Sequence, residues 1–260
     1  MNIVVLVKQV PDTAAERTLS EADHSLDRES ADLVLDEINE RAAEEALTLK
    51  EAVGAEVTVV SMGPDSALDA IRKVLAMGAD RGIHVCDDRL RGADVVTTAQ
   101  VLAAAVRTVA DVDLVLAGDA TTDGQASVVP AVVADLLGLP SLTHAREVTV
   151  EAGGVRAERA TEHGEATLGA PLPALVSVTE KINEPRYPSF KGIMAAKKKP
   201  VATVDLDDLF PDADDTGFLV TRTRVVKAVP RPAWTAGIRV TDDGSAGRRL
   251  VDHLIAQKLV

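Results

Sequence analysis

The sequence predicts an α/β protein built on a doubly wound, mostly parallel sheet. Continuous apolar runs at 3–7, 57–61, 82–85 and 114–117 alternate with stretches of helical periodicity, which is the pattern of βαβ units. Apolar residues make up 46% of the chain and aromatic residues only 2%, so Ala, Val, Leu and Ile must fill the core. Such a core suits strands that helices cover on both faces.

The first strand and helix follow from local patterns. The run at 3–7 is β-branched and continuous, as in central parallel strands. Asp36 is expected to cap the next helix, with Glu37 placing a negative charge in its first turn. The apolar positions of this helix recur at roughly helical spacing: Ala42, Ala43, Ala46, Leu47 and Leu49.

A second strand at 57–61 ends in a Gly63-Pro64 turn. The helix that follows is expected to open at Ser66 and to stop at Gly78.

Two further strand and helix pairs complete the alternation. Strands are expected at 82–85 and 114–117, and a helix rich in Ala and Val at 97–109. The last helix, 129–137, is closed by Gly138.

The pattern changes after Pro140. Shorter strands are expected at 148–150, 155–160 and 174–178, joined by glycine-containing turns. We interpret them as antiparallel additions at the edge of the sheet.

The composition changes again near residue 205, where the chain becomes acidic and is interrupted by prolines. We expect an α/β domain over 1–204 and an extended C-terminal arm over 205–260. Within the arm, a strand-like stretch is expected at 220–226 and a helix at 244–258. An arm with little core of its own is expected to pack on another chain.

Charge and cysteine content narrow the possible partners. The formal net charge of −13 argues against nucleic acid or an anionic membrane surface, because both need a positive counter-surface. The single cysteine, Cys86, cannot form an intrachain disulfide and fits a reducing compartment. Because the run at 3–7 is too short for a signal sequence or a membrane span, we expect a cytoplasmic protein without membrane insertion.

The sequence contains no pattern that predicts a catalytic side chain or a metal centre. The five histidines are scattered and have no cysteine or carboxylate at metal spacing. A nucleophile elbow, a GxGxxG motif and a Walker A motif are all absent from the sequence. We therefore expect neither an enzyme nor a metalloprotein.

A polar loop at 118–129, GDATTDGQASVV, follows a predicted buried strand and precedes a helix. In a doubly wound sheet this position is the carboxyl edge, where ligands bind. Glycines and the N–H groups of a helix N-terminus suit a phosphate, and Thr121, Thr122 and Ser127 offer hydroxyl groups. The same residues also fit an ordinary strand-to-helix turn.

The segment 182–199, INEPRYPSFKGIMAAKKK, combines a turn-forming N-E-P-R-Y with Phe190, a hinge at Gly192 and a lysine triplet. A charge run of this kind is often only a solvated surface. Here Arg186 and Lys191 share the segment with a large apolar side chain. We interpret the segment as an apolar anchor in a cationic rim, displayed for a partner protein.

These motifs resemble the beta subunit of electron-transfer flavoproteins. INEPRYPSFKGIMAAKKK is similar to the signature of that family, and LAMGADRGIHV at 75–85 is similar to a second block. Shorter matches lie at 5–8, 44–51, 61–64 and 235–240. The resemblance therefore covers nearly the whole chain.

The resemblance implies a Rossmann-like, adenine-nucleotide-binding sheet in a heterodimer with a flavin-carrying alpha subunit. That alpha subunit would hold most of the FAD, and the 205–260 arm would pack on it. The pair would take electrons from dehydrogenases such as the acyl-CoA dehydrogenases of fatty acid β-oxidation. The electrons would pass to the respiratory chain, with a quinone oxidoreductase as a possible acceptor.

The resemblance also implies two sets of site residues. AMP would be bound by Leu6, Asp36, Glu37, Ile38, Asn39, Met62, Gly118, Asp119, Ala120, Thr121, Thr122, Asp123, Gly124, Gln125, Ala126, Ser127, Val128 and Val129. Partner dehydrogenases would be recognised by Glu184, Pro185, Arg186, Tyr187, Phe190, Lys191, Gly192, Ile193, Met194, Lys197, Lys198 and Lys199. Phe190 takes the place of an apolar residue, commonly leucine, that inserts into the dehydrogenase.

Two departures and one rival accompany this interpretation. Asp123 lies in a loop that has a Q-T-G-Q-like sequence in many relatives. A carboxylate beside a phosphate is unfavourable unless it points away. The stretch 10–13 resembles electron-bifurcating relatives, which bind a second FAD in place of AMP. Outside the family, a nucleotide-binding sensor of the universal-stress type shares the predicted sheet. We expect AMP and a plain electron carrier.

Overall fold

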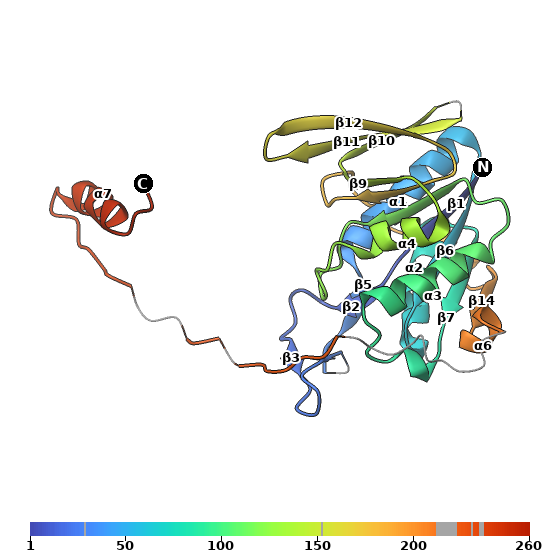
Figure 1. The fold of residues 1–260 in the computed structure, drawn as a ribbon, viewed down its shortest axis with the longest axis horizontal. Coiled ribbons are helices and arrows are strands. Elements are labelled where there is room, and N and C mark those ends of the chain that lie inside the picture. The colour runs from blue at the N-terminus through green and yellow to red at the C-terminus, as the bar shows by residue number, and fades with distance from the viewer. Residues whose placement is uncertain (29, 152, 212–222, 230, 234–236) are drawn as a thin grey trace. The chain divides into compact units, whose positions relative to one another are not determined.

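The computed structural model describes the chain apart from residues 29, 152, 212–222, 230 and 234–236 (Figure 1). The chain divides into two compact units, Met1–Val225 and Val226–Val260. The first unit contains the α/β fold, and the second contains the helix α7 (Ala246–Ala256). The helix expected at 244–258 is thereby confirmed.

A seven-stranded parallel sheet organises the first unit (Figure 1). Its order is β14-β7-β6-β1-β8-β13-β9, and each neighbouring pair is parallel. The strands are β1 (Asn2–Leu6), β6 (Glu56–Met62), β7 (Arg81–Val85), β8 (Leu114–Gly118), β9 (Ser141–Ala145), β13 (Ala174–Val178) and β14 (Val201–Val204). The order reverses between β1 and β8, so the carboxyl ends of these two strands form the switch point of the sheet.

Helices cover both faces of this sheet, which confirms the doubly wound fold. Their bounds are α1 (Glu37–Val53), α2 (Leu68–Met77), α3 (Val95–Arg107) and α4 (Val129–Leu137). On β1, Ile3 and Val5 join the hydrophobic cluster under α1 and α2, whereas Val4 and Leu6 join the cluster under α3 and α4. Burial on both faces is the physical reason for the continuous apolar runs in the sequence.

Several helix ends are capped as expected, but Ser66 does not open α2, which begins at Leu68 after a short 3-10 turn and has no side-chain cap. The carboxylate of Asp36 accepts hydrogen bonds from the N–H groups of Ile38 and Asn39 and so begins α1. Gly54 ends α1 with φ at 72° and Gly138 ends α4 with φ at 70°. Both glycines adopt the left-handed conformation that other residues reach only with strain.

Smaller antiparallel sheets accompany the parallel one. They comprise β10 (Glu147–Glu151) with β11 (Gly154–Thr161) and β12 (Gly164–Pro171), then β2 (Gln9–Pro11) with β5 (Leu33–Leu35), and β3 (Thr18–Leu19) with β4 (Leu26–Asp27). Val148, Val155 and Ala157 of the three-stranded sheet extend the cluster under α1 and α2. The antiparallel additions expected at 148–150 and 155–160 are therefore present, in a sheet of their own.

The expectation of an antiparallel edge strand at 174–178 is wrong. β13 lies between β8 and β9, runs parallel to both, and is buried along its whole length. Its sequence ALVSV does not alternate between apolar and polar residues, and this is the mark of a strand covered on both faces. The two edge strands, β9 and β14, were not predicted, because SLTHA and VATV lack such a run.

The chain stays on the α/β core for some distance after β14. The helix α6 (Leu206–Leu209) places Leu206, 2% exposed, in the cluster under α3 and α4. Of the strand-like stretch expected at 220–226, positions 220–222 lie outside the described residues. The remaining positions, 223–226, form no strand.

Candidate functional site

The loop 118–129 lies at the switch point of the sheet, directly after β8. A Cβ on Gly118 would lie 2.4 Å from Nδ2 of Asn39, so glycine allows the first turn of α1 to approach the strand end closely. The Asn39 amide in turn donates to the carbonyl of Ala120 at 3.4 Å. The start of α1 and the loop therefore lie side by side at the carboxyl edge.

Four side chains from the segment between β1 and α1 hold this loop. We call Lys8, Arg17, Arg28 and Asp36 the loop clamp. Oδ2 of the buried Asp36 accepts a hydrogen bond of 2.7 Å from the N–H of Thr122, while Oδ1 caps α1. The Arg17 guanidinium donates to the Thr122 carbonyl at 2.8 Å. A segment remote in sequence thus fixes the backbone of the loop.

The remaining two members of the loop clamp bind Asp123. Its Oδ2 lies 2.8 Å from Nζ of Lys8 and 2.6 Å from the guanidinium of Arg28. Its Oδ1 accepts hydrogen bonds from the Thr121 hydroxyl at 2.7 Å and from the Gly124 N–H at 2.6 Å. Burial disfavours the charged form, but the two cations and Thr121 outweigh it and hold the pKa of Asp123 well below its usual range. The carboxylate, whose side chain is 0% exposed, therefore points away from the loop surface.

The outer part of the loop, 124–128, is exposed. Gln125 and Ser127 have positive φ values of 49° and 53°, and Val128 follows with φ −121° and ψ −18°. Alternation of left-handed and right-handed residues turns successive N–H groups to one side and creates a concavity for anions. α4 then begins at Val129 without a side-chain cap, so the N–H groups of Val129 and Ala131 add donors at the same point, whereas Pro130 has no N–H group.

The other predicted nucleotide residues lie around this loop. Leu6 ends β1 with its side chain in the hydrophobic core, and the half-buried Met62 ends β6. Glu37 and Ile38 form the first turn of α1, where Oε1 of Glu37 accepts a hydrogen bond of 3.1 Å from the hydroxyl of Thr13. All these positions lie at the carboxyl edge of the sheet.

Sequence reasoning missed several residues of this region. Nothing singled out Arg17, Arg28 or His144, whose Nδ1 lies 3.0 Å from Oδ2 of Asp119. Lys8 did carry a signal, because it directly follows the first apolar strand and so had to lie at the carboxyl edge.

The first residues of the second candidate region, 182–199, are fixed to α1. The Arg186 guanidinium binds Glu44 at 2.9 Å and also contacts Glu51, and its backbone N–H donates to Glu44 at 3.0 Å. Hydrogen bonds to these carboxylates raise the pKa of Arg186 above its ordinary value. The guanidinium is therefore held within the chain instead of standing free beside Phe190.

The middle of this region forms the helix α5 (Phe190–Ala196), which is capped by the Ser189 hydroxyl. A Cβ on Gly192 would lie 2.3 Å from the carbonyl oxygen of Ala76 in α2. Gly192 therefore permits close packing of α5 on α2, and its interpretation as a hinge is wrong. The role of a missing side chain is visible only once the facing helix is in place.

Lys199 closes the segment against the end of α2. Its ammonium group donates to the carbonyls of Leu75 and Ala79. Burial, together with the positive charge of Lys50, lowers the pKa of Lys199. This lysine satisfies one carbonyl in the last turn of α2 and one just beyond the helix, as cations at helix C-termini do.

The rest of the segment displays its side chains. Tyr187 is 95% and Phe190 81% exposed. Around them lie further exposed apolar and cationic side chains: Ile193, Met194, Lys191, Lys197 and Lys198. We call 182–199 the docking segment, a backbone fixed to α1 and α2 that presents apolar and positive groups outward.

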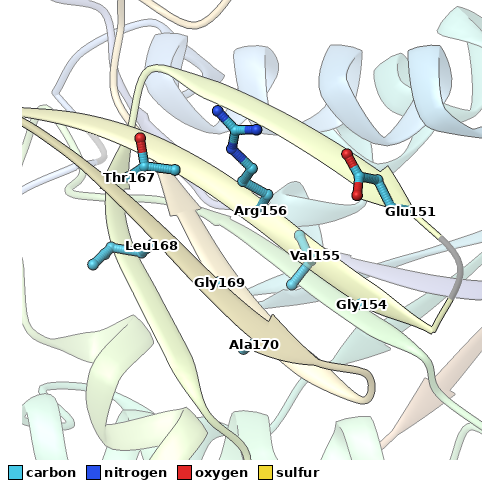
Figure 2. A pocket seen from close by; sticks show the side chains of 8 residues that line it. All are labelled: Glu151, Gly154, Val155, Arg156, Thr167, Leu168, Gly169 and Ala170. Atoms are coloured by element: carbon cyan, nitrogen blue, oxygen red, sulfur yellow. The ribbon is translucent and has the colours of Figure 1, made fainter.

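Two open hollows lie elsewhere on the first unit. One lies between α2 and α5 and is lined in part by Arg72, Lys73 and Ile193, so it adjoins the docking segment. Figure 2 shows the other, on the β10–β12 sheet, with Glu151 and Arg156 among its lining residues. The second hollow contains none of the predicted site residues.

Two further features are absent from the described part of the chain. No helix there has the length and apolar character needed to cross a bilayer. Among the same residues, no group of three or more His, Cys, Asp or Glu side chains is placed to hold a metal ion.

Fold and site together define a doubly wound α/β protein with a polar loop at the switch point and a displayed apolar segment. Residues 23–209 match the family model described as electron transfer flavoprotein domain. The chain is 52% identical to the electron transfer flavoprotein subunit beta of Mycobacterium leprae, over all of this chain and 99% of that protein. It is 33% identical to the subunit beta of Megasphaera elsdenii and 36% identical to that of Thermoanaerobacterium thermosaccharolyticum, each over the full length of both chains. The chain belongs to the family of electron transfer flavoprotein beta subunits.

Proposed function

We propose that this chain works as an electron carrier in a heterodimer with a flavin-bearing alpha subunit, and that it is not itself an enzyme. FAD, held mostly by the alpha subunit, supplies the redox chemistry, and this chain supplies placement and docking. The observation that carries the proposal is the 52% identity to a beta subunit over the full length of the chain.

The second unit supports an alpha-subunit contact. In α7, Leu250, Val251 and Ile255 are each at least half exposed, at 59%, 50% and 57%. An amphipathic helix with an uncovered apolar face gains stability when a partner covers that face. The C-terminal arm is accordingly our candidate for packing on the alpha subunit.

The docking segment supports contact with electron donors. We propose acyl-CoA and related dehydrogenases in the cytoplasm as donors, in fatty acid β-oxidation, with the respiratory chain as acceptor through a quinone oxidoreductase. Phe190 and Tyr187 offer exposed aromatic anchors, and the lysines around them offer electrostatic steering in an otherwise acidic chain.

We assign AMP to the loop 118–129, and the residues present fit such a ligand. The N–H groups of 126–128 and of the start of α4 suit a phosphate, whereas those of Gly124 and Gln125 already donate to Asp123 and Thr121. The carboxylate of Asp123, which stands directly before the exposed part of the loop, is turned inward and paired with Lys8 and Arg28. The further residues assigned to AMP, 36–39, belong to the start of α1.

The proposal is tested on the purified complex. The chain is co-expressed with its alpha subunit, and the absorption spectrum, the flavin content and the acid-released nucleotide are measured. One FAD and one AMP per dimer are expected. Two FAD per dimer would show that a second flavin takes the place of AMP and would support the bifurcating type. A colourless chain without a partner would support a nucleotide sensor.

Electron delivery needs a separate measurement. The dimer is mixed with an acyl-CoA dehydrogenase and its substrate, and bleaching of the flavin is followed in time. Reduction of the dimer that depends on the dehydrogenase is expected. No reduction by any acyl-CoA dehydrogenase would remove this class of donor while leaving the family assignment intact.

A further inference from the structure

We infer that Asp123 is a positioning residue of the nucleotide site, and that it shapes the anion-binding loop without touching the ligand. This inference rests on the proposed binding of an adenosine phosphate at 118–129. In this arrangement backbone N–H groups bind the phosphate of the ligand. Lys8 and Arg28 bind Asp123 and do not bind the phosphate.

The hydrogen-bond capacity of the Asp123 carboxylate is already filled. Lys8, Arg28, the Thr121 hydroxyl and the Gly124 N–H all donate to it, at distances between 2.6 and 2.9 Å. An ionised carboxylate has about four acceptor sites on its two oxygens. No acceptor site remains for a ligand, and a negative charge in this place would repel a phosphate.

The two cations are oriented by the same contacts. The Lys8 ammonium lies within 2.9 Å of both Asp123 oxygens, and the Arg28 guanidinium within 2.6 Å of one. Their side chains are 36% and 42% exposed, whereas Asp123 is fully enclosed between them. A phosphate held by either cation would have to compete with a carboxylate that is already paired in a low-dielectric site.

Asp123 also sits where it can set the shape of the exposed loop. It directly precedes 124–128 and holds the N–H of Gly124, while the N–H of Gln125 donates to the Thr121 carbonyl at 2.9 Å. The left-handed conformations of Gln125 and Ser127 follow within four residues. Such conformations persist only where surrounding contacts fix them, and the ion pairs of Asp123 are the strongest of those contacts.

A rival arrangement makes the opposite prediction. If Lys8 and Arg28 bound the phosphate directly, Asp123 would compete with the ligand for them. Removal of its charge would then tighten binding of AMP, whereas loss of a positioning contact weakens it. The direction in which the AMP affinity changes therefore distinguishes the two arrangements.

The test uses the full heterodimer, stripped of nucleotide and titrated with AMP and separately with adenosine. The main variant is Asp123→Asn, which keeps the shape and removes the charge. The matched control is Asp80→Asn, because Asp80 is also ion-paired, to Lys50 at 2.6 Å, and binds a backbone N–H. Asp80 directly precedes β7 and so lies at the opposite edge of the sheet.

We expect Asp123→Asn to weaken AMP at least about tenfold, in the range of a lost charged hydrogen bond, and to leave adenosine and the control nearly unchanged. A loss confined to the phosphate-bearing ligand distinguishes positioning of the loop from general unfolding. Lys8→Gln should weaken AMP in the same direction, and its effect should not add fully to that of Asp123→Asn.

Tighter or unchanged AMP binding by Asp123→Asn overturns the inference, and so does an equal loss of AMP and adenosine. Failure of the nucleotide site itself has a different signature. In that case the unmodified dimer releases no adenine nucleotide and binds none, and the inference fails with the site before any variant is compared.

Discussion

The loop 118–129 and the docking segment 182–199 follow neighbouring parallel strands, β8 and β13. They differ in what they expose, because the loop exposes backbone groups and the docking segment exposes side chains. The first turns its acidic side chain inward, onto Lys8 and Arg28, and exposes backbone N–H groups. The second fixes its backbone to α1 and α2 and exposes side chains such as Phe190.

The recognition functions proposed for the two regions fit this difference. Backbone N–H groups bind an anion best when they are fixed in position. The loop that carries them must therefore be held by side chains from other segments. A protein surface is suited by a large apolar anchor with charged neighbours, so the chain beneath it must be held by backbone and ionic contacts. In both regions ion pairs fix the segment. The loop then exposes N–H groups, and the docking segment exposes side chains.

The largest effect is expected from Arg186→Ala in the docking segment. Loss of the guanidinium leaves Glu44, whose side chain is 9% exposed, without its cation. The free energy of unfolding should fall by about 3 kcal/mol, the lower end for a broken buried pair, as measured by urea denaturation. AMP affinity should stay unchanged if the two regions are independent.

The control for this change is Arg156→Ala. Its ion pair with Glu158 joins side chains that are 54% and 30% exposed, so about 0.5 kcal/mol or less is expected. A loss at Arg186 no greater than that of the control would show that the docking segment does not depend on α1.

The next effect concerns docking alone. Phe190→Ala should weaken the interaction with a partner dehydrogenase by about 1 to 3 kcal/mol, as expected for a central apolar anchor. Stability and flavin content should not change, because this side chain is 81% exposed. Electron-transfer kinetics at limiting dehydrogenase concentration provide the measurement, and unchanged kinetics would contradict the role given to Phe190. Tyr187→Ala would show whether the second aromatic residue shares that role.

A smaller effect is expected from Gly192→Ala, which tests the packing of α5. The added methyl group would meet the carbonyl of Ala76, so α5 must shift from α2 at a cost of about 1.5 kcal/mol. Gly247→Ala in α7, where the added methyl group would meet no side chain and no other segment within 4 Å, should instead be neutral or favour its helix. Equal effects at the two glycines, measured by thermal unfolding, would restore the hinge interpretation.

The smallest effect is a pH dependence at the loop 118–129. Because the pKa of Asp123 is lowered from its ordinary 3.8 on folding, its charge stabilises the folded state at neutral pH, and this contribution is lost as the pH falls below about 4. The unmodified chain should exceed Asp123→Asn in unfolding free energy by about 1 kcal/mol at pH 7. The difference should shrink toward pH 3, and a difference that grows on acidification would contradict the charge assignment.

Much of the fold could be predicted because its signals are local. Asp36 and Gly138 mark helix ends through contacts within a few residues. Continuous apolar runs mark buried strands, and 174–178 was misjudged although it carried the same signal. The loop and the docking segment were located by their position after a strand and by their composition.

The sequence by itself determined most of the buried strands and the main helices, the place of a polar loop after β8, and the apolar Phe190, which the structure leaves exposed. Only the tertiary structure decided what holds these regions, because their partners are remote. Arg28 and Asp123 are 95 residues apart, Arg186 and Glu44 are 142 apart, and the carbonyl that requires Gly192 belongs to another helix. Propensity and capping act over a few residues, whereas ion pairing and close packing depend on which segments the fold brings together.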